Sequence, residues 1–233
     1  MYSTFGSNNL IWQSADEVPN NLWITGTIFS DQVSMFFTSS FFFDHVLNES
    51  SFMSKIIPKI VVCDVKKLEL HGQDLSLKEY EFLTASGMIE DFIFPSTLIK
   101  EENGKNVYME TILECLPNVK SVLLSVQIPS FSSVAKAEKI CLQKLEKFVL
   151  RSVPHDFNFE AMLVFMTKHK YADIRLNVSQ GTSNFPYMSN LQKYVDQVVQ
   201  EGSIQHPPPL ISFPGQSEES KTGLMKLYSH FHD

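Results

Sequence analysis

The side chains best suited to chemistry in this chain are its cysteines and histidines. Cys141 lies upstream of His155 and Asp156, and a cysteine beside a histidine can serve as a nucleophile with its base. Cys141, however, falls at helical spacing among apolar residues, where a cysteine acts as a small hydrophobic core residue. His155 follows Pro154 and fits an exposed turn. The pattern predicts no catalytic residue.

Metal and cofactor sites are not indicated either. His230 and His232 near the C-terminus could bind a metal, but two histidines two positions apart are a weak ligand set. The chain has no Gly-x-Gly-x-x-Gly motif and no Walker-type phosphate loop. Its three cysteines form no short-spaced pair, which argues against disulfides or a zinc knuckle and fits a cytoplasmic or nuclear protein with reduced thiols. We expect no cofactor.

Composition excludes two further classes. Of 233 residues, 43% are hydrophobic and 19% charged, which is typical of a globular protein. The net charge is −7 and only Arg151 and Arg175 are arginines, whereas nucleic-acid binders usually carry an arginine-rich basic face. The first residues lack the pattern of a secretory signal, and no stretch approaches the ~18 apolar residues of a membrane span. We therefore expect neither nucleic acid nor a membrane as a partner.

The elements that must position any functional side chain come from a repeated strand motif. It recurs five times, with steps of 24, 30, 26 and 26 between first residues (92−68, 122−92, 148−122, 174−148). A period of about 20–30 residues is typical of stacked strand-plus-helix units, each of which buries its apolar face against a neighbour. The five motifs are Leu68-Glu69-Leu70, Phe92-Ile93-Phe94, Val122-Leu123-Leu124, Phe148-Val149-Leu150 and Ile174-Arg175-Leu176.

Apolar stripes at helical spacing separate these motifs. Met109, Ile112, Leu113 and Leu116 form one such stripe, at offsets of 0, 3, 4 and 7. Ser76 and Glu79 have the spacing of a capping box, and the helix that they begin should run to Gly87. Three further stripes are Ala137, Ile140, Cys141, Leu145 and Phe148; Phe159, Met162, Leu163 and Met166; and Met188, Leu191, Val195, Val198 and Val199.

Together these patterns predict an α/β fold of repeating strand–helix units, with a curved, mostly parallel, leucine-rich-repeat-like sheet and helices on one side. We divide the chain into an N-terminal lead-in and capping or covering segment (1–60), a repeat domain (61–202) and a C-terminal capping strand and tail (203–233). The first segment includes a strand at 22–29 and an aromatic-rich stretch at 34–47. The last includes a strand at 211–213 and a helix at 222–231.

Three segments resemble the large nematode group of F-box-associated (FTH-like) proteins. They are Leu75-Ser76-Leu77-Lys78-Glu79-Tyr80-Glu81-Phe82-Leu83, Leu116-Pro117-Asn118-Val119 and Ile211-Ser212-Phe213-Pro214-Gly215-Gln216. The resemblance covers about residues 60–215. Residues 1–60 depart from it, since they lack the Leu-Pro start and leucine-rich three-helix pattern of an F-box.

This resemblance implies a non-enzymatic protein-recognition module, the substrate-selecting part of a ubiquitin ligase whose F-box docks on a cullin adaptor. The cullin adaptor stays an expected partner, although residues 1–60 lack the F-box pattern that would bind it. Two alternatives stay open: a small hydrolase or transferase with an unrecognised site, and a degenerate family member that has kept no partner.

Strand alternation identifies the candidate partner-binding residues. In each motif the first and third residues should face the helices, and the middle residue and the one after the motif should face away. In one interpretation residues 23–43 cover that outer face. In another it is an open surface that binds a partner's apolar side chain, and in a third the register is off by one residue. The candidates are Glu69, His71, Ile93, Leu123, Val149, Arg151 and Arg175.

Overall fold

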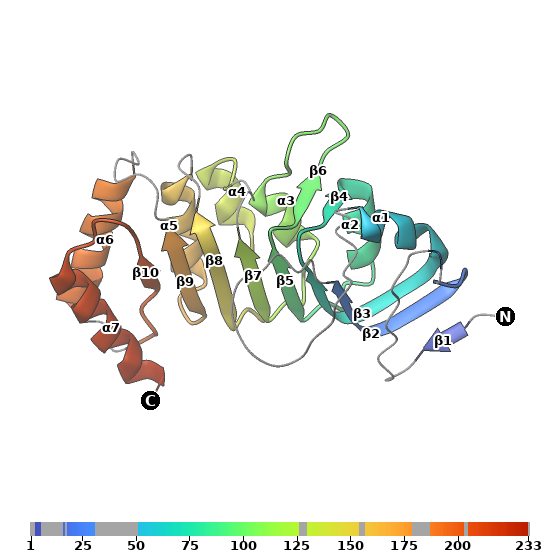
Figure 1. The fold of residues 1–233 in the computed structure, drawn as a ribbon. Helices are drawn as coiled ribbons and strands as arrows, with labels where there is room; N and C mark the ends of the chain where they lie inside the picture. Colours follow the sequence, from blue (N-terminus) through green and yellow to red (C-terminus); the bar gives the residue numbers. More distant parts are fainter. Residues whose placement is uncertain are drawn as a thin grey trace, which may run out of the picture.

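The protein folds around one eight-stranded sheet in which every neighbouring pair of strands is parallel. The computed structural model describes residues 3–5, 16, 18–30, 51–125, 130–153, 157–178, 187–202 and 205–232. The strands lie side by side in chain order, so the sequence colours run across the sheet from blue to red (Figure 1). They are β1 (Ser3–Phe5), β2 (Leu22–Ser30), β3 (Ile60–Leu70), β5 (Asp91–Pro95), β7 (Ser121–Ser125), β8 (Lys147–Val153), β9 (Asp173–Val178) and β10 (Leu210–Ser212).

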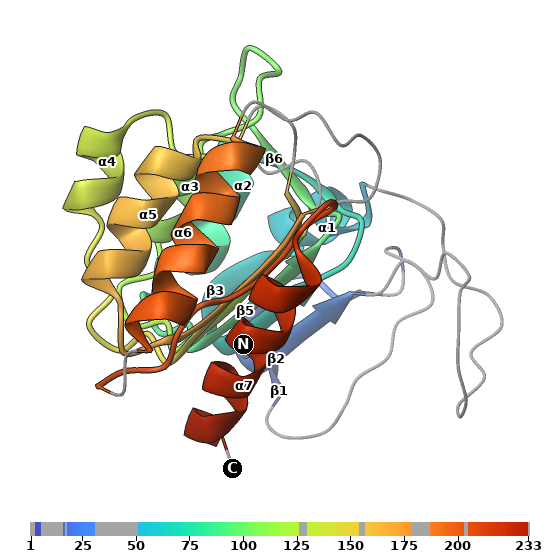
Figure 2. The same ribbon diagram turned by 90° about the vertical axis from the view of Figure 1, so that its left-hand side faces the viewer.

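Most of the helices form a single layer on one face of this sheet (Figure 2). Figure 2, which looks along the row of strands, shows α2 to α6 together on one side. The predicted α/β class, with repeating strand–helix units, is confirmed. The helices are α1 (Phe52–Ile56), α2 (Leu77–Thr84), α3 (Met109–Glu114), α4 (Val134–Lys139), α5 (Phe159–Lys168), α6 (Met188–Glu201) and α7 (Glu218–His232), and a 3-10 turn spans Ile57–Lys59.

The core lies between the sheet and this helix layer. The first and third residues of all five motifs are at most 3% exposed. Phe92 and Phe94 stack with ring centroids 4.0 Å apart, and Tyr80 of α2 meets both rings edge-on. The Tyr80 hydroxyl donates to the carbonyl of Ile112 at 2.7 Å, which gives this fully buried phenol a partner. The inward-facing side chains of the strands and the apolar stripes of the helices therefore pack together in one apolar layer.

Polar side chains connect the turns that follow β3 and β5. The Thr97 hydroxyl donates to the Leu70 carbonyl at 2.6 Å and accepts from the Gln73 amide at 3.3 Å. The Gln73 side-chain oxygen accepts from the Met53 amide at 3.1 Å. Gln73 and Thr97 are 1% and 0% exposed and occupy the same place in consecutive units, where leucine-rich repeats place a buried polar residue.

These turns also position a second, smaller sheet. Its two parallel strands are β4 (Asp74–Ser76) and β6 (Leu98–Lys100). Lys100 pairs with Asp74 at 3.2 Å across them. Stacked turns thus repeat from unit to unit as the main strands do.

The predicted start of one helix agrees with the structure, and its predicted end does not. The capping box is confirmed: the Ser76 hydroxyl accepts from the Glu79 amide at 3.3 Å, and the Glu79 carboxylate accepts from the Ser76 amide at 2.7 Å. Helix α6 ends at Gly202, whose φ of 57° suits a residue without a Cβ. Helix α2 ends at Thr84, three residues before the predicted stop at Gly87.

The predicted helix over 137–148 is wrong in its second half. Helix α4 ends at Lys139, because Ile140 has the extended backbone angles −65° and 127°. Residues 140–146 are irregular, and Cys141 is exposed rather than part of the core. Cys63, by contrast, is 6% exposed, and burial raises the pKa of its thiol to about 12.

The two ends of the chain extend the same sheet. The strand predicted at 22–29 is β2, and β1, within the expected lead-in, pairs alongside it. The strand predicted at 211–213 is β10, and the short helix predicted at 222–231 is the longer α7. The aromatic stretch at 34–47 lies outside the described residues. None of the helices described here has the length and apolar character needed to span a membrane.

Candidate functional site

The face of the sheet opposite α2–α6, here called the far face, carries the middle residues of the five motifs in one line. The strand register pairs each of them with the next, from β3 to β9. Phe29 of β2 and Leu210 of β10 continue the line at its two ends. We call this line the central row: Phe29, Glu69, Ile93, Leu123, Val149, Arg175 and Leu210.

The middle of the central row is apolar and partly accessible. Ile93 and Leu123 are half-buried, and Val149 is 8% exposed. In one interpretation of the sequence, residues 23–43 cover this row. Residues 23–30 instead belong to strand β2 of the sheet, and residues 31–43 lie outside the described residues. Neighbouring strands are ~4.8 Å apart, so these three side chains form an apolar strip about 10 Å long.

Polar side chains border the central row on both sides. On the side where the strands begin, a paired line consists of Lys67, Asp91, Ser121, Lys147 and Asp173. On the side where they end, the line consists of Pro95, Ser125, Arg151 and Asn177, and His71 follows directly after β3. All seven candidate residues from the sequence therefore lie on or beside one face.

Glu69 is held by two neutralising partners at one end of the row. Its carboxylate lies 2.8 Å from Lys67 Nζ and 3.0 Å from His71 Nε2. Burial acts to raise the pKa of Glu69, but these two hydrogen bonds outweigh burial and lower it overall. Phe29 meets the His71 ring edge-on, with centroids 5.7 Å apart.

Arg175 is held in a similar way at the other end. Its Nε and Nη2 donate to Asp173 at distances of 2.7–3.1 Å. The Tyr228 hydroxyl donates to the same carboxylate at 2.8 Å, and the Arg175 guanidinium lies 5.4 Å from the Tyr228 ring centroid. Arg175, one of the candidate partner-binding residues from the sequence, is therefore fixed within the protein.

Three residues that shape this surface were missed from the sequence. Phe29 is 59% exposed and ends the central row, but its place depends on how β2 pairs with β3. Asp173 and Tyr228 together hold Arg175. Asp173 precedes the fifth motif by one position and could have been noted as an acid near Arg175. Nothing local marks Tyr228, which lies 55 positions further along the chain.

The other candidate chemistry is not assembled. Cys141 is exposed, and His155 and Asp156 lie outside the described residues. Within the described part of the chain, no three His, Cys, Asp or Glu side chains are grouped closely enough to hold a metal ion. His169, which the sequence did not single out, has both ring nitrogens bonded to main-chain groups, of Phe165 and Leu142. It is a structural residue.

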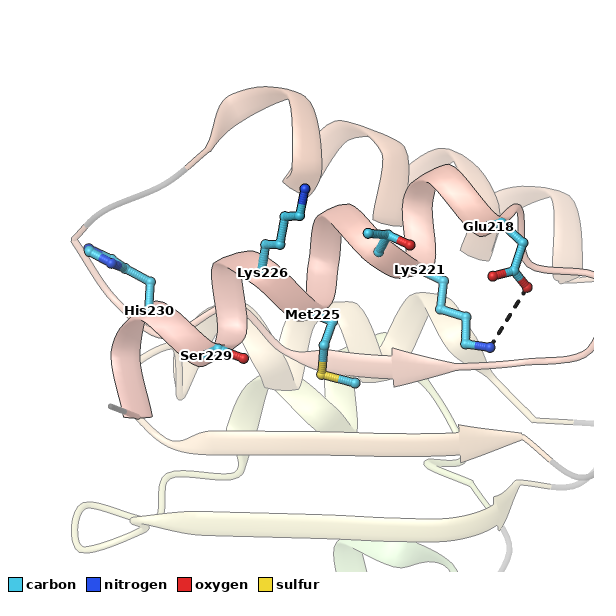
Figure 3. Close-up of a pocket in the computed structure, with 7 residues that line it drawn as sticks. Glu218, Lys221, Met225, Lys226, Ser229 and His230 are labelled. Carbon is cyan, nitrogen blue, oxygen red and sulfur yellow. Dashed lines mark ion pairs between the residues drawn. The ribbon is translucent and has the colours of Figure 1, made fainter.

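A hollow of about 560 Å³ lies along α7. Figure 3 shows its labelled side chains along one side of that helix, with Lys221 and Glu218 3.8 Å apart. Every described residue that lines it belongs to α7. A typical ligand pocket is lined by several chain segments. Because a single helix lines this hollow, it lacks the form of a small-molecule site.

Comparison with known proteins gives no relative. No family model, no curated protein and no solved structure matches this chain.

Proposed function

We propose that this chain is a non-enzymatic protein–protein recognition module that binds its partner through the central row. The observation that carries the proposal is the register of the parallel strands. It aligns the half-buried Ile93 and Leu123 with the largely buried Val149 as an apolar strip between the held charges Glu69 and Arg175. Apolar strips with a polar border are typical of interaction surfaces.

A narrower proposal concerns the kind of assembly. The segments that resemble nematode F-box-associated proteins support a substrate-selecting role related to F-box ubiquitin ligase adaptors. In that role the central row binds the target, and a cullin ligase adaptor belongs to the same complex. A cytoplasmic or nuclear location accords with cysteines whose thiols stay reduced.

Position-specific photo-crosslinking tests the broader proposal. A photoreactive phenylalanine replaces Leu123 on the far face, and in the matched control it replaces Lys139, an exposed residue of the helix layer. Both variants are compared with the wild type by circular dichroism before use, so that folding is known. Irradiation in native cells should give a discrete protein adduct from position 123 and none from position 139.

The adducts decide between the proposals. An adduct at position 123 that disappears when Ile93 is changed to Asp supports binding at the central row. Equal adducts from both positions, or none from position 123 in a folded variant, would overturn it. Recovery of a ubiquitin ligase target or adaptor in that adduct supports the narrower proposal, and partners of another kind contradict it.

A further inference from the structure

We propose that the central row recognises an extended acidic segment in which one apolar residue lies between two carboxylates, in the order acid–x–apolar–x–acid. This inference rests on the proposed function and names the partner's chemistry. It comes from the charges on the far face that have no partner among the described residues.

Two cations on this face are uncompensated within the part of the chain that the structure describes, and both are on β8. Lys147 and Arg151 are exposed, and neither side chain makes an ion pair or hydrogen bond among the described residues. Phe148 and Leu150 point into the core at 0% and 3% exposure, so alternation places Lys147, Val149 and Arg151 together on the far face.

The carboxylates on the same face are largely neutralised. Glu69 is bonded to Lys67 and His71, and Asp173 is bonded to Arg175 and Tyr228. Asp91 remains, but it lies two strands away from β8 in the register. The surface around Val149 is therefore positive, although the whole chain has a net charge of −7.

The spacing of these cations fits an extended partner. Lys147 and Arg151 are four residues apart in one strand, which is roughly 13 Å at ~3.3 Å per residue. An extended segment has the same rise and turns alternate side chains to one face. Its residues i and i+4 can then reach the two cations while i+2 points at Val149 and its neighbours.

The position between the cations accepts an apolar side chain. Leu123 lies beside Val149, and Ile93 lies beside Leu123. The residues before and after Leu123 on the far face are Ser121 and Ser125, and their short side chains leave the strip uncovered. A leucine- or phenylalanine-sized side chain can therefore lie along the strip while its flanking carboxylates meet Lys147 and Arg151.

Selection from a random peptide library displayed on phage tests this inference. The targets are the full chain, a Lys147→Glu/Arg151→Glu variant, and a Lys136→Glu/Lys139→Glu variant that makes the same charge change on the exposed side of α4. The wild type and the α4 control should enrich acid–x–apolar–x–acid peptides. A synthesised peptide with that pattern should bind the β8 variant about tenfold more weakly, since exposed ion pairs contribute ~0.2–1 kcal/mol each.

A charge-swapped peptide gives a result that lost folding cannot imitate. Replacing both acids by lysine should abolish binding to the wild type and restore it to the β8 variant. Enriched peptides that bind the β8 variant as tightly as the wild type, but bind a Leu123→Asp variant weakly, would overturn the acidic motif and leave the proposed function standing. If every enriched peptide binds both the β8 variant and the Leu123→Asp variant as tightly as the wild type, the inference and the proposed function both fail. If an oligonucleotide included in the selection competes for the face, the partner is not a peptide and the inference is wrong.

Discussion

The hydroxyl of Tyr228 donates to the carboxylate of Asp173 at 2.8 Å, which joins the last helix of the chain to a strand 55 residues earlier. Arg175 bonds the same carboxylate, so three side chains form one cluster at the end of the central row. Burial comes first among the causes that raise the pKa of Tyr228 to about 12, followed by its bond to Asp173. The phenol therefore stays protonated as a donor at neutral pH.

Changing Tyr228 to Phe should loosen α7 without unfolding the sheet. The variant loses one hydrogen bond to a charged group, and we expect a cost of about 1 kcal/mol because Arg175 still pairs with Asp173. Hydrogen exchange of the α7 amides measures this directly and should be faster, while exchange in β7 and β8 stays unchanged. Unaltered exchange in α7 would show that Tyr228 does not hold the helix.

Gly223 of α7 lies so close to α6 that a Cβ there would be 2.6 Å from Val199 Cγ1. Alanine favours a helix over glycine by ~1 kcal/mol, but the clash should outweigh this gain and make Gly223→Ala destabilising by about 1–3 kcal/mol. Urea unfolding measures both effects.

The matched variant removes the obstacle. Val199→Ala opens space at the contact, so Gly223→Ala added to it should be neutral or stabilising. The two changes then couple by more than the ~0.5 kcal/mol expected of independent sites. Simple additivity would mean that the helices are not in contact at this point.

Thr97→Val should destabilise the turns between units. The change keeps the shape of the side chain but leaves the Leu70 carbonyl and the Gln73 amide buried without their partner. Loss of a buried partner costs about 1–3 kcal/mol. Urea unfolding of Thr97→Val and of Thr97→Ser, which keeps the hydroxyl, compares the two: serine should retain most of the stability. An equal loss in both variants would assign the effect to packing instead.

His169 should make stability depend on pH. Burial lowers the pKa of its imidazole, whose Nδ1 donates to the Phe165 carbonyl at 2.9 Å while Nε2 accepts from the Leu142 amide at 3.0 Å. Because the unfolded state takes up the proton first, stability is greatest above the unfolded pKa of ~6.5 and is lost as pH falls towards the folded value. The urea midpoint should therefore fall below about pH 6.5.

His169→Gln supplies the comparison for that slope. Glutamine does not titrate, so the variant should be less stable at neutral pH but should lose less stability on acidification. The same slope in both proteins would show that other groups cause it.

The strands were predictable because their signal is local. In β8, for example, Phe148 and Leu150 alternate with Val149, and the observed strand Lys147–Val153 is built around that predicted motif. The capping box at Ser76 was equally local, since its two residues satisfy each other's amides. Periodicity and caps depend on a few neighbouring residues, and the sequence displays those directly.

The segment after α4 shows why periodicity can mislead. Ile140 and Leu142 are buried although the backbone there is not helical. The amide of Leu142 is bonded to His169, a residue on another unit, and no pattern within residues 137–148 reports that contact. The pairing of charges on the far face could not be predicted from the sequence for the same reason. That Arg175 is paired follows from Asp173 and Tyr228, the second of which lies far along the chain.

Because the strands of the eight-stranded sheet lie side by side in chain order, the fold has a modular length. Insertion or loss of one unit would widen or narrow the sheet by ~4.8 Å and leave the remaining pairs intact. Chains of this design could thus acquire binding surfaces of graded width through duplication within the gene. The number of strands between the paired groups at Glu69 and at Arg175 would then set the width of the surface that a partner meets.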